Sequence, residues 1–268
     1  MAYRVAKSNS QQAAWGLRIS LFAIQLLILT WLLHRFASLY TPAAINLVGF
    51  IILSALIALL LSSWGLFRIW NRGQLGLGKA IAGILISLII ILLPVSQVPQ
   101  AWNLPGINDI TTDIASPPSF QTLASARPNG ANSTFYPGTQ FAEAQVQAYP
   151  YIRPVQLNIP AKTTFEVVQK VVKKLGWRIV TTQVPTSDGR PGRIEAVDKT
   201  LIVGFVDDVS IRVRGVGNQS RIDIRSASRF GSHDLGRNAY RINLLISEIN
   251  DAIETGEIIP QARPRNRR

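Results

Sequence analysis

The chain has 268 residues and no cysteine, with 47% hydrophobic and 16% charged residues and a formal net charge of +13. The lack of cysteine excludes disulfides, thiolate nucleophiles and cysteine-based metal sites. Every Asp and Glu lies at or after Asp109, whereas the part before it holds seven Lys and Arg residues. Basic residues of this kind are typical of the flanks of membrane spans, and no zinc-finger or RNP-like pattern accompanies them. We therefore expect no nucleic-acid partner.

Three apolar stretches lie in the N-terminal part, at residues 17–39, 43–67 and 80–95. Each approaches the roughly 20 residues that a helix needs to cross a bilayer. They lack the regular polar positions of a soluble helix, and tryptophans lie near their ends. The first stretch is longer than the apolar region of a signal peptide, and two more stretches follow it. Residues 1–95 are therefore predicted to form a three-helix transmembrane anchor, with the lipid bilayer as partner.

The basic residues also predict an orientation. Three precede or begin the first span and three lie between the second and third spans, whereas only Arg35 lies between the first and second. The positive-inside bias places the more basic side in the cytoplasm. With three spans, everything after Val95 is then expected on the non-cytoplasmic side.

Residues 96–154 are rich in Pro, Asn, Ser, Thr and Ala and show no sustained period. They predict an irregular linker, with a short helix within residues 141–149. Large aromatic side chains are costly to leave in water, so the linker is expected to wrap the following domain and bury its aromatic residues. These are Trp102, Phe120, Phe135, Tyr136, Phe141 and Tyr149.

Residues 155–256 predict an α+β soluble domain with the order β-α-β-β-β-β-α. The expected strands cover residues 155–159, 177–184, 193–205, 209–215 and 220–229, and the helices cover residues 161–175 and 235–253. The short connections favour a two-layer sandwich in which both helices cover one face of a mostly antiparallel sheet. Residues 257–268 form a basic tail.

Period-2 alternation in the last two strands separates apolar from charged residues. Five arginines share the polar face with Asp223, namely Arg212, Arg214, Arg221, Arg225 and Arg229. Guanidinium groups match phosphate and carboxylate groups bidentately, so this face is a candidate anion-binding surface. The alternative is a solvated sheet face with cross-strand ion pairs.

The segment Ser232-His233-Asp234 contains the residue types of a catalytic triad, but adjacent side chains rarely converge and no oxyanion-hole motif accompanies them. Asp234 is instead expected to be the N-cap of the last helix. Asn238 and Arg241 follow on a similar helical side, and Arg241 is positioned to pair back to the sheet.

Asp207 and Asp208 are expected in a tight turn between strands, where Asx hydrogen bonds form readily. Few oxygen ligands lie near them in sequence, and the only histidines are His34 and His233. We therefore expect no metal ion and no cofactor. A hydrolase using Asp207, Asp208 and Asp234 around a water or a metal is retained as an alternative.

Several segments in this order resemble the bacterial and plastid family known as domain of unknown function 1499: INDITTDIASPPSF, GFVDDVSIRVR and SRIDIRSASRFGSHDLGRN. The resemblance covers about residues 108–253. It implies a bacterial envelope setting, and a polar network that joins the linker, the Asp-Asp segment and the last helix. The positions that carry it are Asp109, Thr112, Asp113, Pro117, Pro118, Asp207, Asp208, Arg212, Arg225, Ser226, Ser228, Arg229, Asp234, Gly236, Asn238, Arg241 and Ile242.

The leading hypothesis is a non-catalytic, membrane-anchored envelope protein whose domain binds an anionic ligand or a partner protein. With the resemblance, the expected location is the bacterial inner membrane, with the N-terminus in the cytoplasm and the domain in the periplasm. A structural subunit of a membrane assembly is a further alternative. The candidate ligand-binding residues are Arg212, Arg214, Arg225, Arg229, Asp207, Asp208, Asp234, Asn238 and Arg241.

Overall fold

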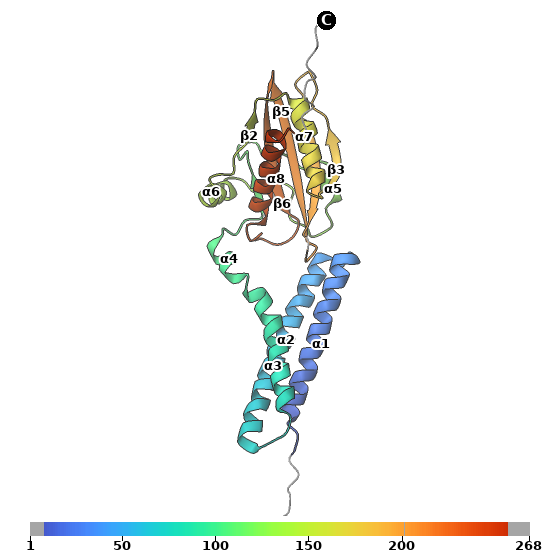
Figure 1. The fold of residues 1–268 in the computed structure, drawn as a ribbon, viewed down its shortest axis with the longest axis vertical. Helices are drawn as coiled ribbons and strands as arrows, with labels where there is room; N and C mark the ends of the chain where they lie inside the picture. The colour runs from blue at the N-terminus through green and yellow to red at the C-terminus, as the bar shows by residue number, and fades with distance from the viewer. Residues whose placement is uncertain (1–7, 201, 257–268) are drawn as a thin grey trace, which may run out of the picture. The chain divides into compact units, whose positions relative to one another are not determined.

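The structure is a computed structural model that describes residues 8–200 and 202–256. The chain divides into two compact units, shown with their elements in Figure 1. The first consists of Met1–Pro99 and Ile202–Gly204, and the second of Gln100–Leu201 and Phe205–Arg268. The predicted basic tail at residues 257–268 lies outside the described residues.

The first unit contains three long helices, α1 (Gln11–Phe36), α2 (Thr41–Arg72) and α3 (Leu77–Val95). All three are long and apolar enough to cross a membrane, as the sequence predicted. The helix α1 begins six residues before its predicted stretch and ends three residues before the end of that stretch, whereas α2 extends beyond its stretch at both ends. At the start of α1 the Ser10 hydroxyl accepts a hydrogen bond from the amide of Ala13 at 3.4 Å, so polar residues can begin the helix.

Small residues allow the three helices to pack closely. A Cβ atom added to Gly16 or Gly83 would collide with the Ser62 hydroxyl, and one added to Gly65 would lie 2.6 Å from the backbone nitrogen of Ala13. Apolar side chains gain little by leaving lipid for a protein interior, so membrane helices associate through such close backbone contacts. The polar Ser62 therefore marks the place where the helices meet.

The second unit is built on one antiparallel sheet with the strand order β1-β6-β5-β4-β3, and β2 also pairs with β6. The predicted α+β class, strand pairing and element order are confirmed. The strands are β1 (Asp109–Thr111), β2 (Val155–Leu157), β3 (Arg178–Gln183), β4 (Gly192–Lys199), β5 (Val206–Val216) and β6 (Gln219–Ser228).

The helices α7 (Ala161–Lys174) and α8 (Arg237–Glu254) lie side by side on one face of the sheet (Figure 1). The residues of β5 and β6 beneath them are apolar and fully buried: Val209, Ile211, Val213, Ile222 and Ile224. Alternation along β5 and β6 therefore sends the charged residues to the opposite face, which we call the outer face.

Residues 96–154 contain three short helices, α4 (Val98–Asn103), α5 (Thr122–Ala126) and α6 (Thr139–Ala148). The predicted short helix corresponds to α6. The strand β1 was not expected, because three residues show no recognisable period. The Gln145 side chain bonds both the amide and the carbonyl of Thr111, at 2.9 and 2.7 Å, and so ties α6 to β1.

The predicted burial of the linker aromatics is correct in part. Phe120 and Tyr149 are buried, and Tyr136 and Phe141 are half-buried. The prediction is wrong for Phe135 and Trp102, whose exposed fractions are 84% and 86%. Burial of an aromatic residue depends on a neighbouring surface to receive it, and composition alone does not identify such a surface.

Candidate functional site

Residues 112–136, which we call the covering segment, lie against the outer face of the sheet. The backbone amides of Gln121 and Leu123 donate to the buried Glu195 carboxylate at 2.6 and 2.8 Å. The Ser210 hydroxyl donates to the carbonyl of Ser119 at 3.0 Å. Phe120 and Leu123 pack with Val197 and Ala227 of the sheet. The outer face is therefore largely covered by the chain itself.

Three arginines and two carboxylates form a cluster at one end of the outer face. Arg212, Arg214 and Arg221 each lie within 3.1 Å of both Asp113 and Asp223. We call these three arginines the arginine rim. The Asp223 side chain is fully buried, whereas 41% of Arg214 and 37% of Arg221 remain exposed. The cluster therefore combines a buried acidic centre with a partly exposed basic edge.

The five groups of this cluster do not balance in charge. Three guanidinium groups share two carboxylates, which leaves one positive charge in excess. Burial acts to raise the pKa of Asp113, but the Ser116 amide and the guanidinium groups of Arg221 and Arg212 outweigh it and lower the pKa below 3.8. Asp113 is thus ionised at neutral pH and holds the covering segment against the rim.

Asp208 forms a second group of ion pairs, which is buried between the outer face and the covering segment. Its fully buried carboxylate accepts from Arg127 Nε and Arg229 Nε at 2.7 and 2.8 Å. Arg127 also donates to the carbonyls of Asn132 and Ser133, which closes the covering segment on itself. Among the described residues, Nη2 of Arg127 has no hydrogen-bond partner.

Arg225 and Asp109 form a third, bidentate pair at 2.9 and 2.6 Å. The Arg225 guanidinium lies 4.6 Å from the centre of the Phe120 ring, in a cation–π arrangement, and donates to the carbonyl of Thr134. Burial raises the pKa of the Asp109 carboxyl, although the Arg225 hydrogen bonds oppose this change. This pair joins β1 to the centre of the sheet.

A separate network lies on the helix-covered face, beneath the N-terminal half of α8. Arg241 Nη2 donates to Asp207 at 2.6 Å, and Arg241 Nε donates to Asp198 at 2.7 Å. Arg241 Nη1 donates to both Ser226 and Asn238, and Asn238 Nδ2 donates to the carbonyl of Asn108. The predicted pairing of Arg241 with the sheet is thus confirmed.

Asp234 stabilises the first turn of α8, although the N-cap itself is Gly236. The predicted N-cap was therefore two residues too early, because the left-handed backbone at Leu235 and Gly236 delays the helix. The Asp234 carboxylate nevertheless accepts from the amides of Gly236 and Asn238, both at 2.8 Å. Burial raises the pKa of Asp234, against the lowering effect of these amides.

His233 is held in a structural arrangement. Its Nδ1 accepts from the amide of Leu235 at 2.9 Å, so the ring proton lies on Nε2. Nε2 is then the donor to the carbonyls of Ala101 and Leu104, both at 3.2 Å. With both nitrogens in use, His233 is not poised as a general base for Ser232.

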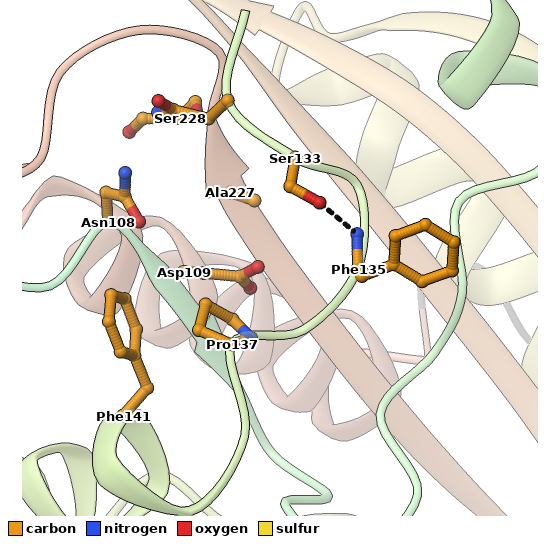
Figure 2. A pocket seen from close by; sticks show the side chains of 9 residues that line it. Asn108, Asp109, Ser133, Phe135, Pro137, Phe141, Ala227 and Ser228 are labelled. Carbon is orange, nitrogen blue, oxygen red and sulfur yellow. Dashed lines mark hydrogen bonds between the residues drawn. The ribbon is translucent and has the colours of Figure 1, made fainter.

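A small cavity of about 210 Å³ lies between β1, the end of β6 and the covering segment (Figure 2). Asp109 and Asn108 lie at its floor, and the exposed Phe135 lies beside it. Both oxygens of Asp109 already accept from Arg225, and the Asn108 amide donates to the carbonyl of Gly231 at 2.6 Å. The polar groups of this cavity are thus largely engaged within the domain.

The nine predicted site residues do not form one site. Asp207 and Asp208 lie in β5 and not in a turn, paired with Ser228 and Ala227 of β6. Because neighbouring strand residues point to opposite faces, Asp207 enters the helix-side network and Asp208 the outer face. Asp234, Asn238 and Arg241 lie with Asp207, whereas Arg212, Arg214, Arg225 and Arg229 lie with Asp208.

The sequence analysis missed four residues that complete these networks: Arg127, Gln145, Glu195 and Asp198. Arg127 and Gln145 lie in the linker, where no hydrophobic period indicates which way a side chain points. Asp198 carried a usable signal, because alternation places it on the same strand face as Ile194 and Ala196. A single acid in an apolar register predicts a buried partner.

Among the described residues, no group of three or more His, Asp or Glu side chains is placed to hold a metal ion. Asp207 and Asp208, two of the three carboxylates in the hydrolase alternative, point to opposite faces of the sheet. A shared water or ion therefore cannot contact both side chains.

Replacing Asp208 with Asn tests the buried ion pairs. The substitution leaves Arg127 and Arg229 without a charged partner in the interior, which should cost about 3–5 kcal/mol of unfolding free energy. Denaturant unfolding of the purified full chain measures this cost. Asp188→Asn is the control, since 60% of that side chain is exposed and its loss should change stability by about 0.5 kcal/mol or less. Equal stability of the two variants would contradict the structural role of Asp208.

The lowered pKa of Asp113 predicts that the folded protein loses stability in acid. Its folded pKa is lowered from 3.8, so it stabilises the fold above that value and this contribution is lost as the pH falls through the folded pKa. The melting-temperature difference between the wild type and Asp113→Asn should therefore be largest at neutral pH and shrink below pH 3.8. A difference that stays constant across this range would show that Asp113 does not act through its charge.

Comparison with known proteins gives one family. A search of curated proteins found no match to this chain. The model of the family described as "Protein of unknown function (DUF1499)" matches residues 109–249, which is more than half of the chain. The match begins at β1 and reaches into α8, so it includes both the ion pairs of the outer face and the network beneath α8. The chain belongs to the DUF1499 family and carries three helices long and apolar enough to cross a membrane.

Proposed function

We propose that this chain is a membrane-anchored, non-catalytic protein whose second unit binds an anionic group, a phosphate or a carboxylate, at the arginine rim. The observation that carries the proposal is an excess positive charge at an exposed edge: three guanidinium groups share two carboxylates, and the side chains of Arg214 and Arg221 are more than a third exposed. An anion placed beside Arg214 and Arg221 would balance this charge. Bidentate contact with guanidinium groups suits both kinds of ligand.

Free hydrogen-bond donors at the rim support the proposal. Arg214 reaches both carboxylates through Nη2, and Arg221 reaches them through Nε and Nη2. The Nη1 group of neither arginine donates to another described residue. Since both side chains are more than a third exposed, these donors are accessible to a ligand.

The other arginines of the outer face are less suited to bind a ligand. The exposed fractions of the Arg225, Arg229 and Arg127 side chains are 3%, 12% and 5%. Their guanidinium groups contact carboxylates and carbonyls of the domain. We therefore place the ligand at Arg214 and Arg221, with Arg212 behind them, and assign Arg225 and Arg229 to the support of the fold.

Inorganic phosphate is the simplest probe of the rim. Phosphate at about tenfold above its Kd should stabilise the purified full chain by about 1.4 kcal/mol, compared with sodium chloride of equal ionic strength. Arg214→Gln should abolish this effect, since it leaves two guanidinium groups for two carboxylates. Arg178→Gln is the control, because Arg178 is exposed and lies on β3, away from the rim. Equal stabilisation of wild type and Arg214→Gln would reject the site.

We further propose a bacterial inner-membrane location with the N-terminus in the cytoplasm and the second unit in the periplasm. The distribution of basic residues supports this orientation, since only Arg35 lies near the junction of α1 and α2, whereas Arg68, Arg72 and Lys79 lie near the junction of α2 and α3. Within this proposal the anion would be a component of the cell envelope.

Single-cysteine labelling tests the orientation, because the chain has no other cysteine. The Ser187→Cys variant, changed at an exposed residue between β3 and β4, should react in intact cells with a membrane-impermeant thiol reagent. The Asn71→Cys variant, changed at an exposed residue near the end of α2, should react only after the cells are opened. The reverse pattern would overturn the proposed orientation.

A further inference from the structure

The loop between β4 and β5 has an apolar tip, residues 202–204. The exposed fractions of Ile202 and Val203 are 72% and 42%. Loops at sheet ends are usually polar, and the other two hairpin loops of this sheet follow that rule. The β3–β4 loop contains Thr186, Ser187, Asp188 and Arg190, and the β5–β6 turn is Gly217-Asn218.

The tip contributes Ile202–Gly204 to the first unit, where its backbone is bonded to α1. Trp31 Nε1 donates to the carbonyl of Ile202 at 2.7 Å. The carbonyl of Val203 lies 2.8 Å from His34 Nδ1, and since a carbonyl only accepts, Nδ1 carries the proton. His34 Nε2 lies 3.1 Å from the Thr41 hydroxyl and is hydrogen-bonded to it. Two carbonyls of the tip are thus satisfied by side chains near the C-terminal end of α1.

This end of α1 is where a membrane-spanning helix leaves the hydrocarbon. Trp31 and Tyr40 lie on or just after its last turns, and such amphipathic rings favour the membrane interface. Residues 202–204 contain no charged side chain, so their entry into the interface would bury no charge. The surroundings of the tip and its composition therefore both suit the membrane interface as its partner.

We infer that residues 202–204 insert the apolar side chains of Ile202 and Val203 into the headgroup boundary of the bilayer that α1 spans. The occupant of this surface is lipid, because the carbonyls of the tip are held beside a helix that is long and apolar enough to cross a membrane. Apolar side chains at this depth behave like those of an interfacial amphipathic segment. This inference goes beyond anion binding, since the tip lies at the start of β5, about 26 Å along the strand from Arg214.

Fluorescence of a labelled cysteine tests the insertion in the full chain reconstituted into nanodiscs. Cysteine replaces Ile202 or, in a second variant, Val203, and each carries an environment-sensitive dye. Ser187→Cys is the matched control, because that polar loop lies at the opposite end of β4. We expect the dye at either tip position to emit at shorter wavelength, resist quenching by iodide and be quenched by lipids with a spin label near the headgroup. The dye at position 187 should show the opposite behaviour.

Two results would overturn the inference. If iodide quenches the tip dyes as strongly as the dye at position 187, the tip lies in water. If the tip dyes resist iodide but spin-labelled lipids do not quench them, protein covers the tip, either this chain or a second copy. Neither measurement depends on Arg214 or on phosphate, so the outcome is independent of the proposed anion site.

Discussion

Asp208 accepts hydrogen bonds from Arg127 and Arg229 while its own side chain is fully buried, and the covering segment depends on this double ion pair. Burying a guanidinium group is costly unless a carboxylate compensates for the lost water. Arg127 comes from the covering segment, whereas Asp208 lies in β5 and Arg229 directly follows β6. Closure of the segment over the sheet is therefore tied to charge pairing as much as to apolar burial.

Asp207 and Asp208 are adjacent in β5 and connect the networks on the two faces of the sheet. Asp208 anchors the outer face, and Asp207 accepts from Arg241 of α8 on the other side. Since the two residues are adjacent in one strand, a displacement of β5 would disturb both networks together. At the start of β1, Asp109 accepts from Arg225 on the outer face, and the backbone carbonyl of the preceding residue Asn108 accepts from Asn238 of α8.

The arginine rim differs from the other charged groups of the outer face in its exposure. Arg127 and Arg229 also share a single carboxylate, Asp208, but their side chains are only 5% and 12% exposed. Arg225 with Asp109 forms a neutral pair inside the domain, whereas the rim keeps one excess positive charge at a partly exposed edge. An excess positive charge at an exposed edge is a reason to assign binding there. The rest of the outer face is explained by stability, because its charged groups are buried with partners inside the domain.

The amino-acid sequence by itself determined the three apolar helices, the order of the strands and helices after residue 155, and the face to which the residues of β6 and of β5 from Val209 onward point. These features depend on local periodicity and on the length of apolar runs, which short stretches of sequence contain in full. The restriction of carboxylates to residues after 108 likewise separates the anchor from the domain by composition alone.

Only the tertiary structure decided what covers the charged face and which charges meet. Arg127 lies 81 residues from Asp208, and Asp109 lies 116 residues from Arg225. The linker has no period that predicts its path, so its place over the outer face and the addition of β1 to the sheet could not be inferred. The nine candidate residues separated into two networks for the same reason: alternation within β5 assigns directions, but contacts between distant segments assign partners.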